Sequence, residues 1–266
     1  MAPLELVKSM TGKAVDMIDL HNHILCGLDD GAKTIEESVE MCRISYQDGV
    51  RTIVATPHVL PRIYKNDRFT ILSKVQELNE TIKKFGVPSS EFRILPGADV
   101  HFTSDIFQRY EREEVVTVDD QGRYLLIEFA FQGIPYQAEE VLFQLMARGI
   151  IPIISHPERN MEIGQNPKRY YEMVRMGCLG QVTAMSLTGE FGPGIRRVAE
   201  RLLKNRMVHI IASDAHSTDG RPPILSSAVR AAEKIVGKEE AQRMVREYPQ
   251  AVIEGRKADV PEPIKR

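Results

Sequence analysis

Cysteine, net charge and long apolar runs are all scarce in this chain of 266 residues. The three cysteines form no CxxC motif, so we expect no disulfide scaffold, and a reducing cytoplasm fits the composition. The formal net charge of −2 offers no electrostatic match for nucleic acid. No apolar run approaches the length of a membrane span, and residues 1–16 lack the apolar segment of a signal peptide. We therefore expect a cytoplasmic protein without nucleic-acid partners or membrane insertion.

Apolar runs of strand length recur along the chain, and each is followed by turn or polar residues. They cover residues 17–21, 51–58, 92–100, 123–131, 150–158, 178–186 and 208–216. Most runs are continuous rather than alternating, which is typical of parallel strands that are buried on both faces.

Helical patterns separate these runs. A capping box from Thr34 to Glu37 starts a helix that we expect to end near Gln47, before Gly49. Further helices are expected at 67–85, 137–147, 167–176, 194–205, 223–236 and 239–248. Strands that alternate with helices predict an α/β fold with a parallel sheet. Seven such units favour a closed, slightly irregular barrel over an open sheet.

Residue types that bind metals stand at the carboxyl ends of these expected strands. His21 and His23 end the first strand, and Asp214 and His216 end the last; residues i and i+2 of a strand point to the same face. The strands between them end in His58, Asp99, Glu128 and His156. Barrels carry their chemistry at this end, and imidazole with carboxylate suits Zn²⁺, Mn²⁺ or Fe²⁺. The pattern predicts one metal-binding cup, into which an aspartate of the loop after the first strand also reaches.

Each of these residues also has a simpler interpretation. A lone HxH motif is more often incidental than a metal site, and a single strand-end histidine is usually a hydrogen-bonded surface residue. Glu128 is harder to explain in that way, because an isolated carboxylate in a buried strand is costly unless it is paired. The coincidence at so many strand ends favours metal binding. We interpret His101 and His209 as structural and the cysteines as packing residues.

The motifs DLHNHILCGLDDGA, ATPH, LPGADVHF, LLIEF, SHPERN and SDAHSTDGRPP resemble those of the PHP (polymerase and histidinol phosphatase) superfamily. Within it, the closer similarity is to bacterial manganese-dependent protein tyrosine phosphatases of capsular and exopolysaccharide synthesis. The resemblance covers nearly the whole chain after residue 16. It implies a distorted (β/α)7 TIM-like barrel as a single domain over 17–266, after an N-terminal extension at 1–16. It also implies three metal ions, with Mn expected and Fe or Zn as the alternatives.

The resemblance further implies roles for single residues. The ligands divide into His21, His23 and Asp214 for one ion, Glu128 and His156 for a second with Asp99 bridging the two, and Asp30, His58 and His216 for a third. Arg159 and Arg221 would contact the phosphate, with pairing to surface carboxylates as the alternative. Two positions depart from the family pattern, because Asp99 replaces the usual Glu and Cys26-Gly27 replaces the usual Pro-Gly. A shorter bridging side chain can weaken the bridge or change the metal spacing.

The implied chemistry is hydrolysis by a metal-activated hydroxide, since metal ions lower the pKa of bound water from about 15.7 toward about 7. Arginine forks match the geometry of phosphate, and a phenolate leaves more readily than an alkoxide. Cysteine-dependent phosphatases need an arginine six residues after the nucleophile, and the residues at those positions here are Ala32, Asp48 and Ala184. That route is excluded.

Three functions follow from these observations. The first is a metal-dependent protein tyrosine phosphatase, with the tail of a bacterial tyrosine kinase that controls capsule or exopolysaccharide synthesis as the expected substrate. The second is a phosphatase of the same fold that acts on a small phosphoester such as histidinol phosphate or a nucleotide. The third is a non-catalytic subunit that regulates the kinase, although a binding module has no need of so many converging metal ligands. The sequence leaves the oligomeric state open.

Overall fold

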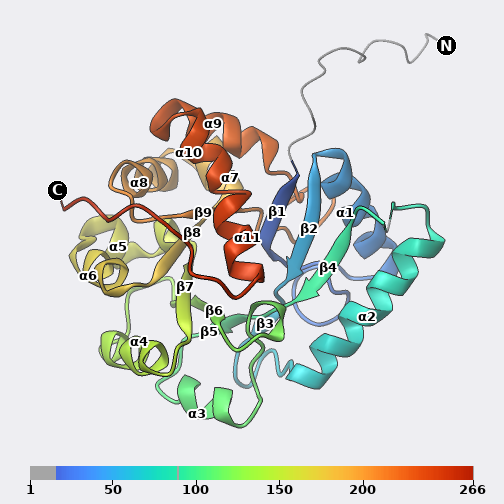
Figure 1. The fold of residues 1–266 in the computed structure, drawn as a ribbon, viewed down its shortest axis with the longest axis horizontal. Coiled ribbons are helices and arrows are strands. Elements are labelled where there is room, and N and C mark those ends of the chain that lie inside the picture. The colour runs from blue at the N-terminus through green and yellow to red at the C-terminus, as the bar shows by residue number, and fades with distance from the viewer. Residues whose placement is uncertain (1–15, 89, 266) are drawn as a thin grey trace.

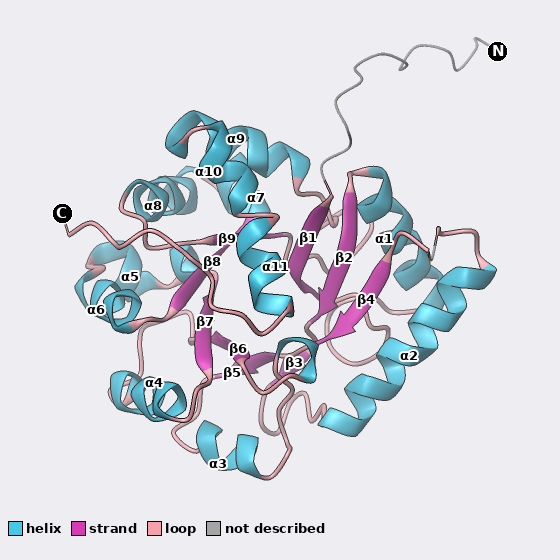
Figure 2. Cartoon of the chain, in the orientation of Figure 1, coloured by secondary structure: helices cyan, strands magenta, loops and turns pink. Residues whose placement is uncertain are grey.

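The computed structural model describes residues 16–88 and 90–265, which form a ring of parallel strands inside a layer of helices (Figures 1 and 2). The strands are β1 (Met17–Asn22), β2 (Val50–Ala55), β3 (His58–Val59), β4 (Arg93–Pro96), β5 (Asp99–His101), β6 (Tyr124–Glu128), β7 (Ile151–Ser155), β8 (Leu179–Thr183) and β9 (Ile210–Ala212). The helices are α1 (Ile35–Gln47), α2 (Arg68–Lys84), α3 (Ile106–Glu111), α4 (Ala138–Ala147), α5 (Met161–Gln165), α6 (Lys168–Met176), α7 (Ala184–Thr188), α8 (Pro193–Lys204), α9 (Ser226–Val236), α10 (Lys238–Arg243) and α11 (Glu247–Ile253).

The strands occupy seven positions around the ring, two of which are interrupted. β2 and β3 share the second position and β4 and β5 the third, because β2 pairs with β4 and β3 pairs with β5. From β5 the ring continues through β6, β7 and β8 to β9. Asn22, at the end of β1, pairs with Ala215 beyond β9 and so joins the two edges. The expected α/β class and distorted barrel are confirmed.

The two interruptions were not predicted, since residues 51–58 and 92–100 each look like one continuous strand. The strands are broken at Thr56-Pro57 and at Gly97-Ala98. A Cβ atom at Gly97 would lie 2.7 Å from Val54 Cγ1, so the interrupted strand approaches its neighbour too closely for a side chain. The interruptions place His58 and Asp99 at the start of new short strands, where they pair with each other.

An apolar cluster fills the ring and closes one of its ends. Ile18, Leu126 and Ile210 point inward from their strands and meet Val252 and Ile253 of α11. Figure 1 shows α11 across the ring, and Ile18 N, near the start of β1, donates a hydrogen bond to Val245 O on that side. A second cluster packs the outward strand residues against the surrounding helices. The end where the strands finish is therefore the one that remains available for polar side chains.

Most helices begin and end near the expected residues. Thr34 Oγ1 accepts a hydrogen bond from Glu37 N, and the Glu37 carboxylate accepts one from Lys33 N, so the start of α1 is capped as expected. The pattern at 239–248 is divided between α10 and α11, and the short helices α3, α5 and α7 were not predicted. The prediction of a strand over 178–186 was wrong beyond Thr183, because α7 begins at Ala184. Most residues of α7 are buried, so its apolar composition resembles that of a buried strand.

No helix within residues 16–88 and 90–265 is both long enough and apolar enough to cross a membrane. The expected extension at 1–16 lies, except for Asp16, outside the described residues. The division of the chain at residue 16 therefore stays a prediction.

Gly180 in β8 offers a test of packing between the ring and its helices. A Cβ atom there would collide with Tyr170 Oη and would lie 2.5 Å from Met207 O. Tyr170 Oη donates a hydrogen bond to that same carbonyl at 2.8 Å, so neither neighbour can move freely. We expect Gly180→Ala to lower the free energy of unfolding by about 1–3 kcal/mol, measured by urea denaturation.

Gly194→Ala is the matched control, because nothing lies within 4 Å of a Cβ atom at this helical position. Alanine favours a helix over glycine, so we expect the control to keep or slightly raise stability. Equal stability of Gly180→Ala and the wild type would contradict the close packing between β8 and α6.

Candidate metal centre

One pocket of about 260 Å³ opens at the end of the ring where the strands finish. Every predicted ligand except His156 belongs to one of three overlapping groups, and the donor atoms of each group lie within 4.8 Å of one another. The groups are His21, His23 and Asp214; His23, Asp30, His58 and His216; and His58, Asp99 and Glu128. The strand ends thus bring histidine and carboxylate donors into one cup.

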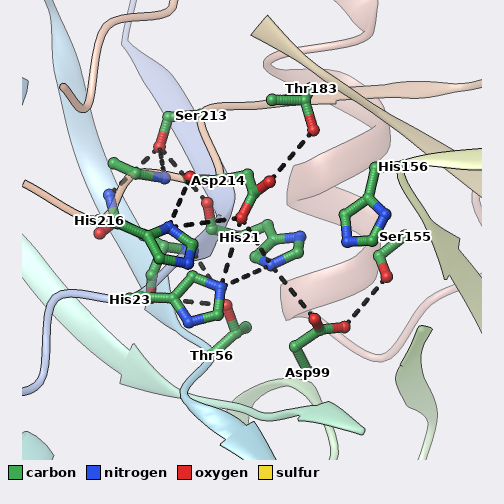
Figure 3. Close-up of polar contacts among 12 residues, drawn as sticks. His21, His23, Thr56, Asp99, Ser155, His156, Thr183, Ser213, Asp214 and His216 are labelled. Carbon is green, nitrogen blue, oxygen red and sulfur yellow. Dashed lines mark hydrogen bonds and ion pairs between the residues drawn. The ribbon is translucent and has the colours of Figure 1, made fainter. Parts of the chain in front are cut away.

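The first group lies where β1 meets β9. The register of β1 against β2 shifts by one residue within 19–22, and such a bulge changes the direction of the side chains that follow. His21 Nε2 lies 3.0 Å from His23 Nε2, and each of these atoms lies 3.4 Å from Asp214 Oδ1 (Figure 3). Gln181 Oε1 lies 2.9 Å from His21 Nδ1, which leaves His21 Nε2 facing the group.

The second group is arranged by an aspartate that the sequence analysis did not select. Asp29 Oδ2 lies 2.7 Å from His23 Nδ1 and also accepts a hydrogen bond from His58 N at 2.8 Å. Although burial opposes the charge, Asp29 raises the pKa of His23 to about 10. Asp30 Oδ1, next to it, lies 3.7 Å from His58 Nε2 and 3.6 Å from His216 Nε2. The two adjacent aspartates therefore differ in role: Asp29 orients a histidine, whereas Asp30 faces the pocket.

The third group contains the aspartate that departs from the family pattern. Asp99 Oδ2 lies 3.2 Å from His58 Nδ1 and 3.7 Å from His21 Nε2, so the shorter side chain still lies between two groups. Ser155 Oγ donates a hydrogen bond to Asp99 Oδ1 at 3.0 Å (Figure 3). In the structure, the histidine that is grouped with Asp99 and Glu128 is His58, whereas the resemblance implied His156 as the histidine ligand beside Glu128.

His156 lies beside this third group rather than in it. Its Nε2 atom is 3.5 Å from Glu128 Oε1, and its backbone adopts a left-handed φ of 34°. Burial and the nearby Arg159 hold the pKa of His156 well below its usual value, so the ring is neutral, as a metal ligand must be.

Arg159 and Arg221 both pair with one buried carboxylate oxygen. Asp214 Oδ2 lies 2.8 Å from Arg159 Nη2 and 2.6 Å from Arg221 Nη2, while Oδ1 of the same carboxylate faces the histidines. Both guanidinium groups also lie over the ring of Phe191, 5.5 and 5.8 Å from its centre. Both arginines therefore pair with a buried carboxylate and not with a carboxylate on the surface. The two guanidinium groups thus share one carboxylate oxygen at the pocket.

The remaining histidines and cysteines fall outside the three groups. His101 Nδ1 lies 3.6 Å from Glu128 Oε2, at the edge of the cup. His209 is buried away from it, where Nδ1 accepts a hydrogen bond from Gly180 N and burial lowers its pKa to about 4. The three cysteines are free, and none of them lines the pocket.

The donor set fits a cluster of metal ions. Asp99 Oδ2 and His156 Nε2 are buried and make no well-formed hydrogen bond among the described residues; their neighbours His58 Nδ1 and Glu128 Oε1 lie at 3.2 and 3.5 Å. Buried polar atoms without partners are costly in a folded protein, and a cation would satisfy both. Mixed imidazole and carboxylate donors suit Mn, Fe or Zn. The residues present thus match the metal chemistry that the sequence predicts.

Comparisons with known proteins agree with this geometry. The profile of a family described as "Capsular polysaccharide synthesis, CpsB/CapC" matches residues 17–254. Tyrosine-protein phosphatase YwqE of Bacillus subtilis is 37% identical over 223 residues, which cover 84% of this chain and 86% of the relative. Tyrosine-protein phosphatase CpsB of Streptococcus pneumoniae is 32% identical over 242 residues, which cover 89% and 98%.

A solved structure has the same fold over nearly the whole chain. It comes from a study of YwqE from Bacillus subtilis and CpsB from Streptococcus pneumoniae, described as unique metal-dependent tyrosine phosphatases. The TM-score is 0.88 at 34% identity, with 94% of this chain and 100% of that one covered. A lactonase from Listeria monocytogenes, at 13% identity and a TM-score of 0.55, shares the fold alone. The profile match and these relatives together show that the chain belongs to the CpsB/CapC family of capsular polysaccharide synthesis proteins.

Proposed function

We propose that this chain is a metal-dependent tyrosine phosphatase that hydrolyses phosphotyrosine in protein. The observation that carries the proposal is the single pocket in which three groups of metal ligands adjoin two arginines. The names of the relatives support it, since YwqE and CpsB are called tyrosine-protein phosphatases. A regulatory subunit that only binds a kinase would not need this set of donors.

The two arginines would bind the phosphate. Arg159 and Arg221 line the pocket, and two guanidinium groups that share one carboxylate keep N–H donors available for phosphate oxygens. The ring of Phe191 beneath both guanidinium groups limits their movement, so they are held ready for the substrate. Bound metal ions would supply an activated water and would neutralise charge on the phosphate.

The finer points of the proposal concern the metal, the partner and the location. The mixed donors with several oxygen ligands favour Mn, with Fe or Zn as alternatives, and the three ligand groups correspond to three ions. The expected substrate is the phosphorylated tail of a bacterial tyrosine kinase in the cytoplasm. The capsule-synthesis description of the family supports this substrate class.

Removal of the metal should abolish activity. The purified protein should carry two or three transition-metal ions per chain and lose phosphotyrosine hydrolysis in excess chelator, since the arginines alone cannot activate water. Mn²⁺ added to the chelated protein should restore turnover, which phosphate release from a phosphotyrosine peptide measures. Histidinol phosphate and a nucleotide serve as comparison substrates. Full activity in excess chelator would contradict the metal mechanism, and faster hydrolysis of a comparison substrate would favour a small phosphoester.

His58 connects two ligand groups and should be essential. Its Nε2 atom faces Asp30 while its Nδ1 atom faces Asp99, so His58→Ala removes a donor from both groups. We expect a strong loss of turnover and of at least part of the metal, with an unchanged circular dichroism spectrum. His101→Ala is the control, because His101 lies at the edge of the cup but belongs to none of the groups. Unchanged turnover and metal content in His58→Ala would show that His58 is only a strand-end residue.

Arg221 tests whether phosphate binding can be separated from metal binding. Arg221→Ala removes a charge-assisted donor whose bonds strengthen as charge develops during transfer, so kcat/KM on a phosphotyrosine peptide should fall by on the order of 10²–10³. Metal content, measured by inductively coupled plasma spectrometry, should stay unchanged because Arg159 still pairs with Asp214. Arg196→Ala, which removes an exposed ion pair on α8, is the control. Loss of the metals in Arg221→Ala would instead make Arg221 a support for Asp214.

A further inference from the structure

A large apolar side chain is exposed at the rim of the metal pocket. Phe131 follows β6 by three residues, lines the pocket and is 57% exposed. The other apolar residues that line the pocket are Phe129 and Pro157, which also come from the loops after β6 and β7. The apolar wall of the pocket thus comes from these two loops, whereas the other lining residues are polar or charged. An exposed aromatic ring beside a pocket of convergent polar groups is typical of a ligand-binding site.

The backbone that carries Phe131 is held in place from both sides. Asn160 Nδ2 donates a hydrogen bond to Ala130 O at 2.9 Å, and Met161 N donates one to Phe131 O at 2.9 Å. Glu162 Oε2 then accepts a hydrogen bond from Ile134 N at 2.9 Å. The ring is therefore exposed although its backbone is fixed. A ligand that contacts the ring therefore does not have to order this backbone, which lowers the conformational-entropy cost of binding.

The position of the arginines determines what Phe131 can contact. A phosphate bound by Arg159 and Arg221 would lie over Asp214, at the floor of the pocket. The organic group of the ester must then extend toward the mouth, along whichever wall is apolar. Phe131 forms the exposed part of that wall, since Phe129 is buried. An aromatic side chain forms favourable contacts with an aromatic ring.

We propose that Phe131 binds the aromatic ring of the substrate ester and thereby sets a preference for aryl over alkyl phosphomonoesters. This inference rests on the proposed function and adds a residue that determines its specificity. The metal ligands and the arginines recognise the phosphate in any ester, so they cannot distinguish tyrosine from serine by themselves. Contact between two aromatic rings provides that distinction without any further polar group.

The test compares two non-hydrolysable ligands on the metal-loaded protein. Phenylphosphonate and methylphosphonate share the anionic group and differ in the aromatic ring. Phe131→Ala should raise the dissociation constant of phenylphosphonate about two- to tenfold, the range expected for one aromatic pair, and leave that of methylphosphonate unchanged, as measured by calorimetry. The kcat/KM for a phosphotyrosine peptide should fall by a similar factor. Phe143→Ala is the matched control, because Phe143 on α4 is 61% exposed and does not line the pocket.

The outcomes separate this inference from the proposed function. Equal changes for both phosphonates would show that Phe131 only shapes the pocket, and no change for either would show that it does not contact the ligand; both overturn the inference. A wild-type protein that binds phenylphosphonate through Phe131 but releases no phosphate from phosphotyrosine would overturn the proposed function instead. Phe131→Trp, which retains an aromatic ring, should keep tighter binding of phenylphosphonate than Phe131→Ala.

Discussion

The Asp214 carboxylate connects the two halves of the site. One of its oxygens faces His21 and His23, and the other faces both arginines. Although burial opposes its ionisation, Arg159 and the nearby His21 hold the pKa of Asp214 well below its usual value. The residue adopts a left-handed φ of 52°, and its N–H donates a hydrogen bond to His21 O at 2.8 Å. The proposed metal ligands and the two arginines proposed to bind phosphate therefore contact a single side chain.

The fold was predictable where the signal is local. Continuous apolar runs and a capping box depend on neighbouring residues, so the succession of strands and helices could be inferred from their spacing. The interruption at Gly97-Ala98 depends on how closely Gly97 approaches Val54 of the neighbouring strand, which the spacing of apolar residues does not display. α7 was missed for a related reason, because a single helical turn that is mostly buried has the same apolar composition as the end of a strand.

The site was predictable in composition but not in detail. Parallel strands bring their ends together whatever the loops do, so histidines and carboxylates at those positions could be expected to meet. The groups that orient them come from distant parts of the chain: Gln181 contacts His21 across 160 residues. Asp29 and Asp30 are adjacent and chemically identical, and only the folded loop shows that one faces a histidine and the other the pocket. The pairing of both arginines with Asp214 likewise has no local signature.

Closure of the ring between β1 and β9 also determines when during synthesis the site can exist. His21 and His23 emerge near the start of translation, whereas Asp214 and His216 emerge near its end. At about 5–20 residues per second, the first pair waits roughly 10–40 s for its partners. A nascent chain therefore carries only a partial set of donors, of the kind that many divalent ions can occupy. The complete set of proposed ligands forms only in the finished polypeptide, so under the proposed function the retained ion would be selected from the metals present after translation ends.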